Sequence, residues 1–165
     1  MKLNQRITRT ALLLALAIAV QQFRIQGLTG PAINAILILT IAYVDVYAAA
    51  IVGSVTPILA VINGIMPLAI VAPFIIIANI VYVFSYNWQY KNNKFSAIAL
   101  SAILKYAVLA IAVTFIIEVP PPVAYALTTP QLFTAVSGGI IGTIIIKYLP
   151  LENALEETEK KNIRG

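Results

Sequence analysis

The residue best suited to bind a ligand is a lysine inside an otherwise apolar run. Lys105 lies about ten residues into the run of residues 95–117. As an α-helix this run places Lys105 about 15 Å from its start. A lysine in the middle of a membrane span is costly and normally faces a cavity or a partner group. The alternative is a structural role, in which the ammonium snorkels or pairs with a backbone carbonyl.

Neutral polar side chains on other runs complete a possible binding site. Arg24 stands in a polar segment, residues 21–31, which contains two glycines and a proline. Such a segment can cap a site and move to admit a ligand, although an interfacial anchor is an equal alternative. The set favours a neutral or anionic solute, because a cation would want a carboxylate. The predicted binding residues are Arg24, Asn34, Asn63, Asn79, Lys105, Gln131 and Thr134.

Small residues recur at helical spacing in the first apolar run. Ala11, Ala15 and Ala19 are four residues apart and therefore share one helix face. Small side chains let another backbone approach closely, which is a main source of helix association in lipid. The stripe predicts close packing, either against another helix of this chain or against a partner protein.

Two further runs place polar or small residues on one face. Near the C-terminus, Gln131 and Thr134 share a face with Gly138 and Gly142, and the glycines are typical of packing within the chain. In the run of residues 67–86, a shared face is predicted for Asn79, Tyr82 and Tyr86. Tyr86 also fits an inner aromatic belt together with Trp88 and Tyr90.

Composition excludes much other chemistry. The chain has 165 residues, of which 61% are hydrophobic and 10% charged, against roughly 25% charged in soluble domains. So apolar a chain of this size needs lipid as its solvent. It has no Cys and no His, and four of its six acidic residues lie after residue 150. Thiolate and imidazole chemistry, metal sites and paired carboxylates are therefore not expected, and we predict a protein that is not an enzyme and has no cofactor.

The apolar runs predict an all-α integral membrane protein. A span needs about 17 to 25 residues as helix. Only Asp45 divides the second run from the third, and without that division the count falls to five. One undivided helix would be about 46 Å long, well beyond a bilayer, which favours an interfacial turn at Asp45. The six predicted spans are residues 7–25, 31–44, 47–62, 67–86, 95–117 and 130–149.

The distribution of Lys and Arg predicts the orientation. With six spans, nine of the 11 basic residues fall on one side, which the positive-inside rule assigns to the cytoplasm together with both termini. The net charge of +5 is thus a topology signal and does not indicate nucleic acid binding. Residues 1–150 form the predicted membrane domain, and residues 151–165 a short polar cytoplasmic tail. The nine residues are Lys2, Arg6, Arg9, Lys91, Lys94, Lys147, Lys160, Lys161 and Arg164.

This pattern resembles the substrate-binding S components of energy-coupling factor (ECF) vitamin transporters. These are small six-helix proteins of the prokaryotic cell membrane with cytoplasmic termini. The resemblance covers nearly the whole chain through several degenerate motifs. They are TALLLALA at residues 10–17, LTGPAIN at 28–34, GSVTP at 53–57, SAILKY at 101–106 and the segment 131–142.

The resemblance implies a mechanism. An S component captures a micronutrient from outside under a mobile first loop, docks onto a membrane scaffold (T) subunit driven by two ATP-binding-cassette ATPases, and releases the solute inward. Ala11, Ala15 and Ala19 would form the docking face, and the lid would include Gln26, Gly27, Thr29 and Gly30. The chain itself has no phosphate-binding loop. A self-sufficient facilitator or channel and a structural subunit of a membrane complex are the alternative functions.

Overall fold

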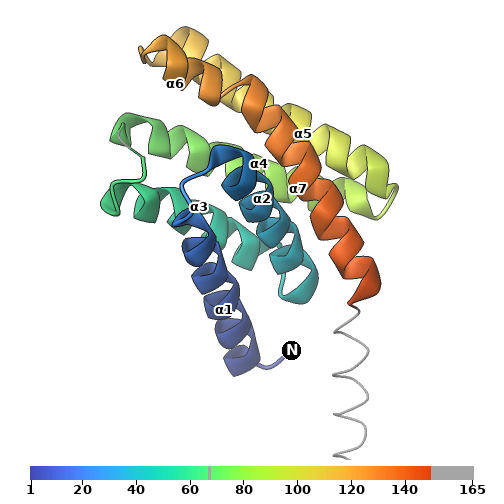
Figure 1. Cartoon of the computed structure of the whole chain (residues 1–165). Coiled ribbons are helices and arrows are strands. Elements are labelled where there is room, and N and C mark those ends of the chain that lie inside the picture. The colour runs from blue at the N-terminus through green and yellow to red at the C-terminus, as the bar shows by residue number, and fades with distance from the viewer. Residues whose placement is uncertain (67, 150–165) are drawn as a thin grey trace, which may run out of the picture.

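The computed structural model describes residues 1–66 and 68–149, and this part of the chain is built from helices (Figure 1). The predicted polar tail, residues 151–165, lies outside the described residues. Six helices have 17 to 20 residues each. They are α1 (Leu3–Gln21), α2 (Gln26–Tyr43), α3 (Val46–Ile62), α4 (Ala72–Tyr90), α5 (Lys94–Ile111) and α7 (Thr129–Tyr148).

Shorter elements complete the helices near the ends of the bundle. A 3₁₀ turn (Ala69–Val71) leads into α4, a π-helical segment (Ala112–Ile116) continues α5, and the short α6 (Pro121–Ala126) precedes α7. Four helical segments are long and apolar enough to cross a membrane: Leu3–Gln21, Ala69–Tyr90, Lys94–Ile116 and Pro121–Tyr148. Shorter apolar helices cover Gly27–Tyr43 and Val46–Ile62. These helices indicate a multi-pass membrane protein, as the composition predicted.

The turn predicted at Asp45 is confirmed and has a clear local cause. Asp45 is the N-cap of α3, where its carboxylate accepts a hydrogen bond from the Ala48 N–H at 2.8 Å. The same carboxylate pairs with Arg6 Nε at 2.7 Å. Since an N-cap satisfies an otherwise unpaired amide, α3 begins as a separate helix at this residue.

The loop predicted before the second span is shorter than expected. Residues 26–31 form the first turns of α2, and only residues 22–25 connect it to α1. Of the two glycines here, Gly30 serves helix packing. A Cβ at Gly30 would lie 2.7 Å from Thr134 Cγ2, so the close contact between α2 and α7 depends on this glycine. Tertiary packing thus overrides the low helix propensity of Gly and Pro.

The N-terminus, the α2–α3 turn and the end of α7 lie together at one end of the bundle. Arg9 Nη1 donates to the Tyr43 carbonyl at 2.9 Å, and the Tyr43 hydroxyl donates to the Leu149 carbonyl at 2.7 Å. The α4–α5 turn lies at this end too, since the Tyr86 and Thr143 hydroxyls are 2.7 Å apart. We call this the basic end, because Lys2, Arg6, Arg9, Lys91, Lys94 and Lys147 lie on the segments that meet there.

The predicted shared face of Asn79, Tyr82 and Tyr86 on α4 is confirmed. The prediction that Tyr86 belongs to an aromatic belt is wrong. Asn79, Tyr82 and Tyr86 are all buried. Tyr86 faces the core with its hydroxyl on Thr143, whereas Trp88 is 69% exposed. Four residues along a helix return to the same face, so that Tyr86 follows Tyr82 inward.

Candidate functional site

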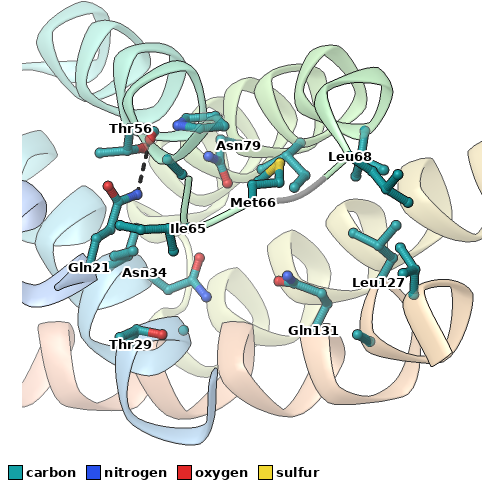
Figure 2. A pocket seen from close by; sticks show the side chains of 18 of the residues that line it. Gln21, Thr29, Asn34, Thr56, Ile65, Met66, Leu68, Asn79, Leu127 and Gln131 are labelled. Atoms are coloured by element: carbon teal, nitrogen blue, oxygen red, sulfur yellow. Dashed lines mark hydrogen bonds between the residues drawn. The ribbon is translucent and has the colours of Figure 1, made fainter. Parts of the chain in front are cut away.

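A cavity of about 370 Å³ lies at the end of the bundle opposite the basic end. Its walls come from the end of α1, the start of α2, the end of α3, the start of α4, the middle of α5, α6 and the start of α7. Figure 2 shows side chains from these separate elements around one space. Most of the lining is apolar, and the polar side chains are Gln21, Arg24, Thr29, Asn34, Thr56, Asn79, Lys105 and Gln131.

Lys105 is the centre of the polar wall. It lies in the middle of α5, and its side chain is only 3% exposed. The ammonium donates to Asn34 Oδ1 at 2.6 Å and to Asn79 Oδ1 at 2.8 Å, and lies 5.2 Å from the centre of the Tyr82 ring. Two amide oxygens and an aromatic face thus stabilise the cation in place of water. The prediction that Lys105 faces a cavity and polar partners is confirmed.

Asn79 is oriented by a proline on a neighbouring helix. Pro57, inside α3, has no N–H to donate to the carbonyl of Gly53 four residues earlier. Asn79 Nδ2 donates to that carbonyl instead, at 2.8 Å. Because the amide nitrogen is engaged there, the oxygen of Asn79 points to Lys105. A Cβ at Gly53 would lie 3.0 Å from Asn79 Cβ, so the glycine gives Asn79 its room.

Asn34 is positioned by the contact between α2 and α7. A Cβ at Gly138 would lie 2.5 Å from both Asn34 Cβ and the Pro31 carbonyl oxygen. A Cβ at Gly142 would meet Ile38 Cβ at 2.8 Å. The two glycines therefore let α7 lie directly on α2, which confirms the predicted packing role of this face.

A second polar pair lies on another wall of the cavity, between α1 and α3. Gln21 Nε2 donates to the Thr56 carbonyl at 3.0 Å, the contact drawn as a dashed line in Figure 2. Gln21 is 7% exposed and Thr56 is 1% exposed. Gln21 Oε1 and Thr56 Oγ1 have no hydrogen-bond partner among the described residues. Most buried polar atoms are satisfied, so two unsatisfied atoms on residues that line one cavity are unusual.

The free hydroxyl of Thr56 contrasts with other hydroxyls on these helices. Thr40 Oγ1 donates to the Ile36 carbonyl at 2.7 Å, and Ser54 Oγ donates to the Ala50 carbonyl at 2.8 Å. This bond to the carbonyl four residues earlier is the usual solution for a hydroxyl inside a helix. Thr56 lacks it, so its hydroxyl has no hydrogen-bond partner among the described residues.

Five of the seven predicted binding residues line the cavity: Arg24, Asn34, Asn79, Lys105 and Gln131. The other two lie outside its lining. Asn63 is exposed at the C-cap of α3. Thr134 is buried beside Gly30 and donates to the Gln131 carbonyl at 3.0 Å.

Of the four residues predicted as a lid, two line the cavity and two do not. Thr29 and Gly30 line the cavity, whereas Gly27 is exposed and Gln26 begins α2. Arg24, in the short α1–α2 connection, has a φ of 55°, a conformation that non-glycine residues rarely adopt. The sharp turn there brings an exposed arginine to the edge of the cavity.

Gln21 and Thr56 were absent from the predicted site. Gln21 belongs to the polar segment that begins after the first apolar run, and Thr56 precedes a helix-internal proline. Pro57 leaves the carbonyl of Gly53 without its helical donor, and Asn79 takes that carbonyl, so the proline gave no signal for the Thr56 hydroxyl.

The half of the bundle nearer the basic end is filled by packed side chains. Leu37, Ile38, Val52, Val83 and Tyr86 are buried there with at most 1% exposure. They belong to one core cluster that joins α2, α3 and α4. The cavity is therefore a pocket at one end of the bundle, with a packed floor.

The alanine stripe of α1 is exposed along its length. Ala11, Ala15 and Ala19 are all exposed, while α1 buries Ala17 and Gln21 against the rest of the bundle. Within the described residues, the helix therefore uses a different face for packing inside the chain.

Comparison with known proteins gives no assignment: no model of a protein family matches the chain, and neither a curated protein nor a solved structure matches it.

Proposed function

We propose that this chain is the membrane-embedded substrate-binding (S) subunit of an ECF transporter in a prokaryotic cell membrane. It captures a vitamin or related micronutrient from outside and delivers it inward together with a T subunit and two ATPases. The observation that carries the proposal is the cavity itself, where buried polar groups from separate helices converge at one end of an apolar bundle. Such a pocket, apolar with a few placed polar groups, is typical of small-molecule binding.

The proposed topology has six spans with both termini in the cytoplasm. The basic end then faces the cytoplasm, by the positive-inside rule, and the cavity faces outward. At 17 residues, α3 is about 26 Å long, slightly short of a hydrocarbon core of roughly 30 Å. A mismatch of this size is accommodated by local thinning of the bilayer.

The packed floor favours capture over free passage. A channel needs a continuous path, but buried side chains from three helices fill the half of the bundle below the cavity. Release to the cytoplasm then requires a larger movement of the protein, which a driven partner supplies. The exposed alanine stripe offers a surface on which another backbone can approach α1 closely.

Co-purification tests the partner part of the proposal. The tagged chain is expressed with the T subunit and ATPases encoded in the same genome, and the complex is isolated in detergent. Ala15→Trp is expected to abolish the complex while leaving solute binding intact. The matched control is Ala99→Trp, because Ala99 is also exposed but lies on α5. A complex that survives Ala15→Trp contradicts the docking role, and solute flux through liposomes containing this chain alone contradicts the transporter-subunit proposal.

A further inference from the structure

We propose that the cavity binds a compact organic monoanion, a carboxylate, with two points of attachment. Its charge pairs with Lys105, and its other end presents an N–H or O–H donor to Gln21 Oε1 beside the Thr56 hydroxyl. This inference rests on the proposed solute-binding function and names the ligand class of that site.

The first point of attachment is the uncompensated charge of Lys105. Its ammonium is held by two neutral amide oxygens and a tyrosine ring. No Asp or Glu is among the residues that line the cavity. Within the described chain the one ion pair joins Arg6 to Asp45, at the basic end. Buried charges in proteins are normally paired, so the cavity lacks an anion that a ligand can supply.

Hydrogen-bond capacity leads to the same conclusion. An ammonium has three N–H donors, and Lys105 uses two of them on Asn34 and Asn79. Asn34 uses Oδ1 as the acceptor for the lysine, and its Nδ2 on the same amide is a donor. A carboxylate has two oxygens, which can accept from the remaining ammonium proton and from the Asn34 amide together.

Size and lining define the rest of the anion. A volume of about 370 Å³ is near the lower end of small-molecule pockets, which run from about 300 to 1,000 Å³. The predominantly apolar lining fits an organic body rather than a small inorganic ion. One buried cation matches a single negative charge, since Arg24 is exposed at the edge.

The second point of attachment is the unsatisfied pair between α1 and α3. Gln21 Oε1 can only accept a hydrogen bond, and Thr56 Oγ1 can donate or accept. Both atoms are buried and have no protein partner in the described part of the chain, and both belong to residues that line the cavity. A buried polar atom without a partner destabilises the empty protein, and a bound donor removes that cost. The ligand therefore carries an N–H or O–H group at the end away from its carboxylate.

A double-mutant cycle of unfolding midpoints tests whether Lys105 lacks a counterion, and it does not require the ligand to be known. Asn34→Asp places a carboxylate where Asn34 Oδ1 already lies 2.6 Å from the lysine nitrogen. After exhaustive dialysis, Asn34→Asp is expected to raise the thermal unfolding midpoint by several degrees, and the same change in a Lys105→Met background is expected to lower it. Asn63→Asp, the same exchange at an exposed site, is the control. An equal effect of Asn34→Asp in both backgrounds overturns the role of the lysine charge.

Mass spectrometry of the bound metabolite tests the ligand class directly. The protein is equilibrated with a cell metabolite extract, washed and denatured, and the released molecules are identified. We expect a carboxylate, with occupancy reduced at least tenfold by Asn34→Asp. Thr56→Val is expected to lower occupancy about two- to tenfold without lowering the unfolding midpoint, because the lost hydroxyl bonds only the ligand. Thr40→Val, which removes a satisfied buried hydroxyl, is expected to leave occupancy unchanged.

The outcomes separate this inference from the proposed function. A neutral or cationic metabolite bound at the site overturns the carboxylate assignment and leaves solute binding in place. If no metabolite is retained, the proposed function is contradicted, and the double-mutant cycle still decides whether Lys105 lacks a counterion.

Discussion

Replacing Gly138 by alanine tests how the α2–α7 contact positions the site. The added Cβ would lie 2.5 Å from Asn34 Cβ and 2.5 Å from the Pro31 carbonyl oxygen. Ordinary contacts begin at 3.4 Å, so α2 and α7 must separate by about 1 Å. A shift of about 1 Å exceeds the roughly 0.5 Å spread of normal N–H···O distances, and the contact of Asn34 with Lys105 is expected to break.

The magnitude follows from overpacking. Inserting a methyl group into a packed contact costs about 1 to 3 kcal/mol. For a chain of this size, each kcal/mol moves the thermal unfolding midpoint by about 2 to 4 °C. Gly138→Ala is therefore expected to lower the midpoint by about 2 to 12 °C relative to a matched glycine-to-alanine exchange. Retained metabolite, measured by mass spectrometry, is expected to fall by about tenfold or more with the loss of the charged hydrogen bond.

Gly27→Ala is the matched exchange. Gly27 belongs to α2, and a Cβ there meets nothing within 4 Å. Its replacement is expected to leave the midpoint unchanged or slightly raised, because alanine favours helix. Equal midpoints and equal metabolite occupancy for the two variants would show that the glycine contact does not set the position of Asn34.

Three further substitutions test the N-cap of α3, the hydrogen bonds of Asn79 and the hydroxyl of Tyr82. Asp45→Ala is expected to lower the free energy of unfolding by about 1 kcal/mol, mainly because α3 loses its N-cap. An unchanged unfolding midpoint would contradict this. Asn79→Leu removes the partner of the buried Gly53 carbonyl and one partner of Lys105. We therefore expect the free energy of unfolding to fall by about 2 to 4 kcal/mol, against about 0.5 kcal/mol or less for Asn63→Leu at an exposed site. Tyr82→Phe keeps the ring beside the lysine and removes one bond to the Ala135 carbonyl. It is expected to cost about 1 kcal/mol and to retain the metabolite; loss of the metabolite would show that the hydroxyl itself matters.

Much of the fold was predictable because the bilayer imposes simple length and polarity rules. The long apolar helices and the turn at Asp45 follow from hydrophobic runs and one acidic residue. The burial of Lys105 also followed, since a cation inside an apolar helix needs polar partners. The shared face of Asn79 and Tyr82 required only the helical repeat.

The rest depended on tertiary contacts that local patterns do not encode. Residues 26–31 looked like a loop because glycine and proline are poor helix formers, yet packing against α7 makes them helical. The pairing of Gln21 with Thr56 depends on how α1 lies against α3. Asn63 has the right chemistry for the site, but it falls one residue beyond the last turn of α3, where it is exposed.

The most direct test of solute binding compares metabolites retained by the wild type and by Lys105→Met. Both proteins are purified in the same detergent, equilibrated with one metabolite extract, washed and denatured for mass spectrometry. We expect one small molecule in near-stoichiometric amount on the wild type and at least tenfold less on the variant, because the variant lacks the charged centre of the cavity. Identical metabolite profiles from the two proteins would contradict this expectation.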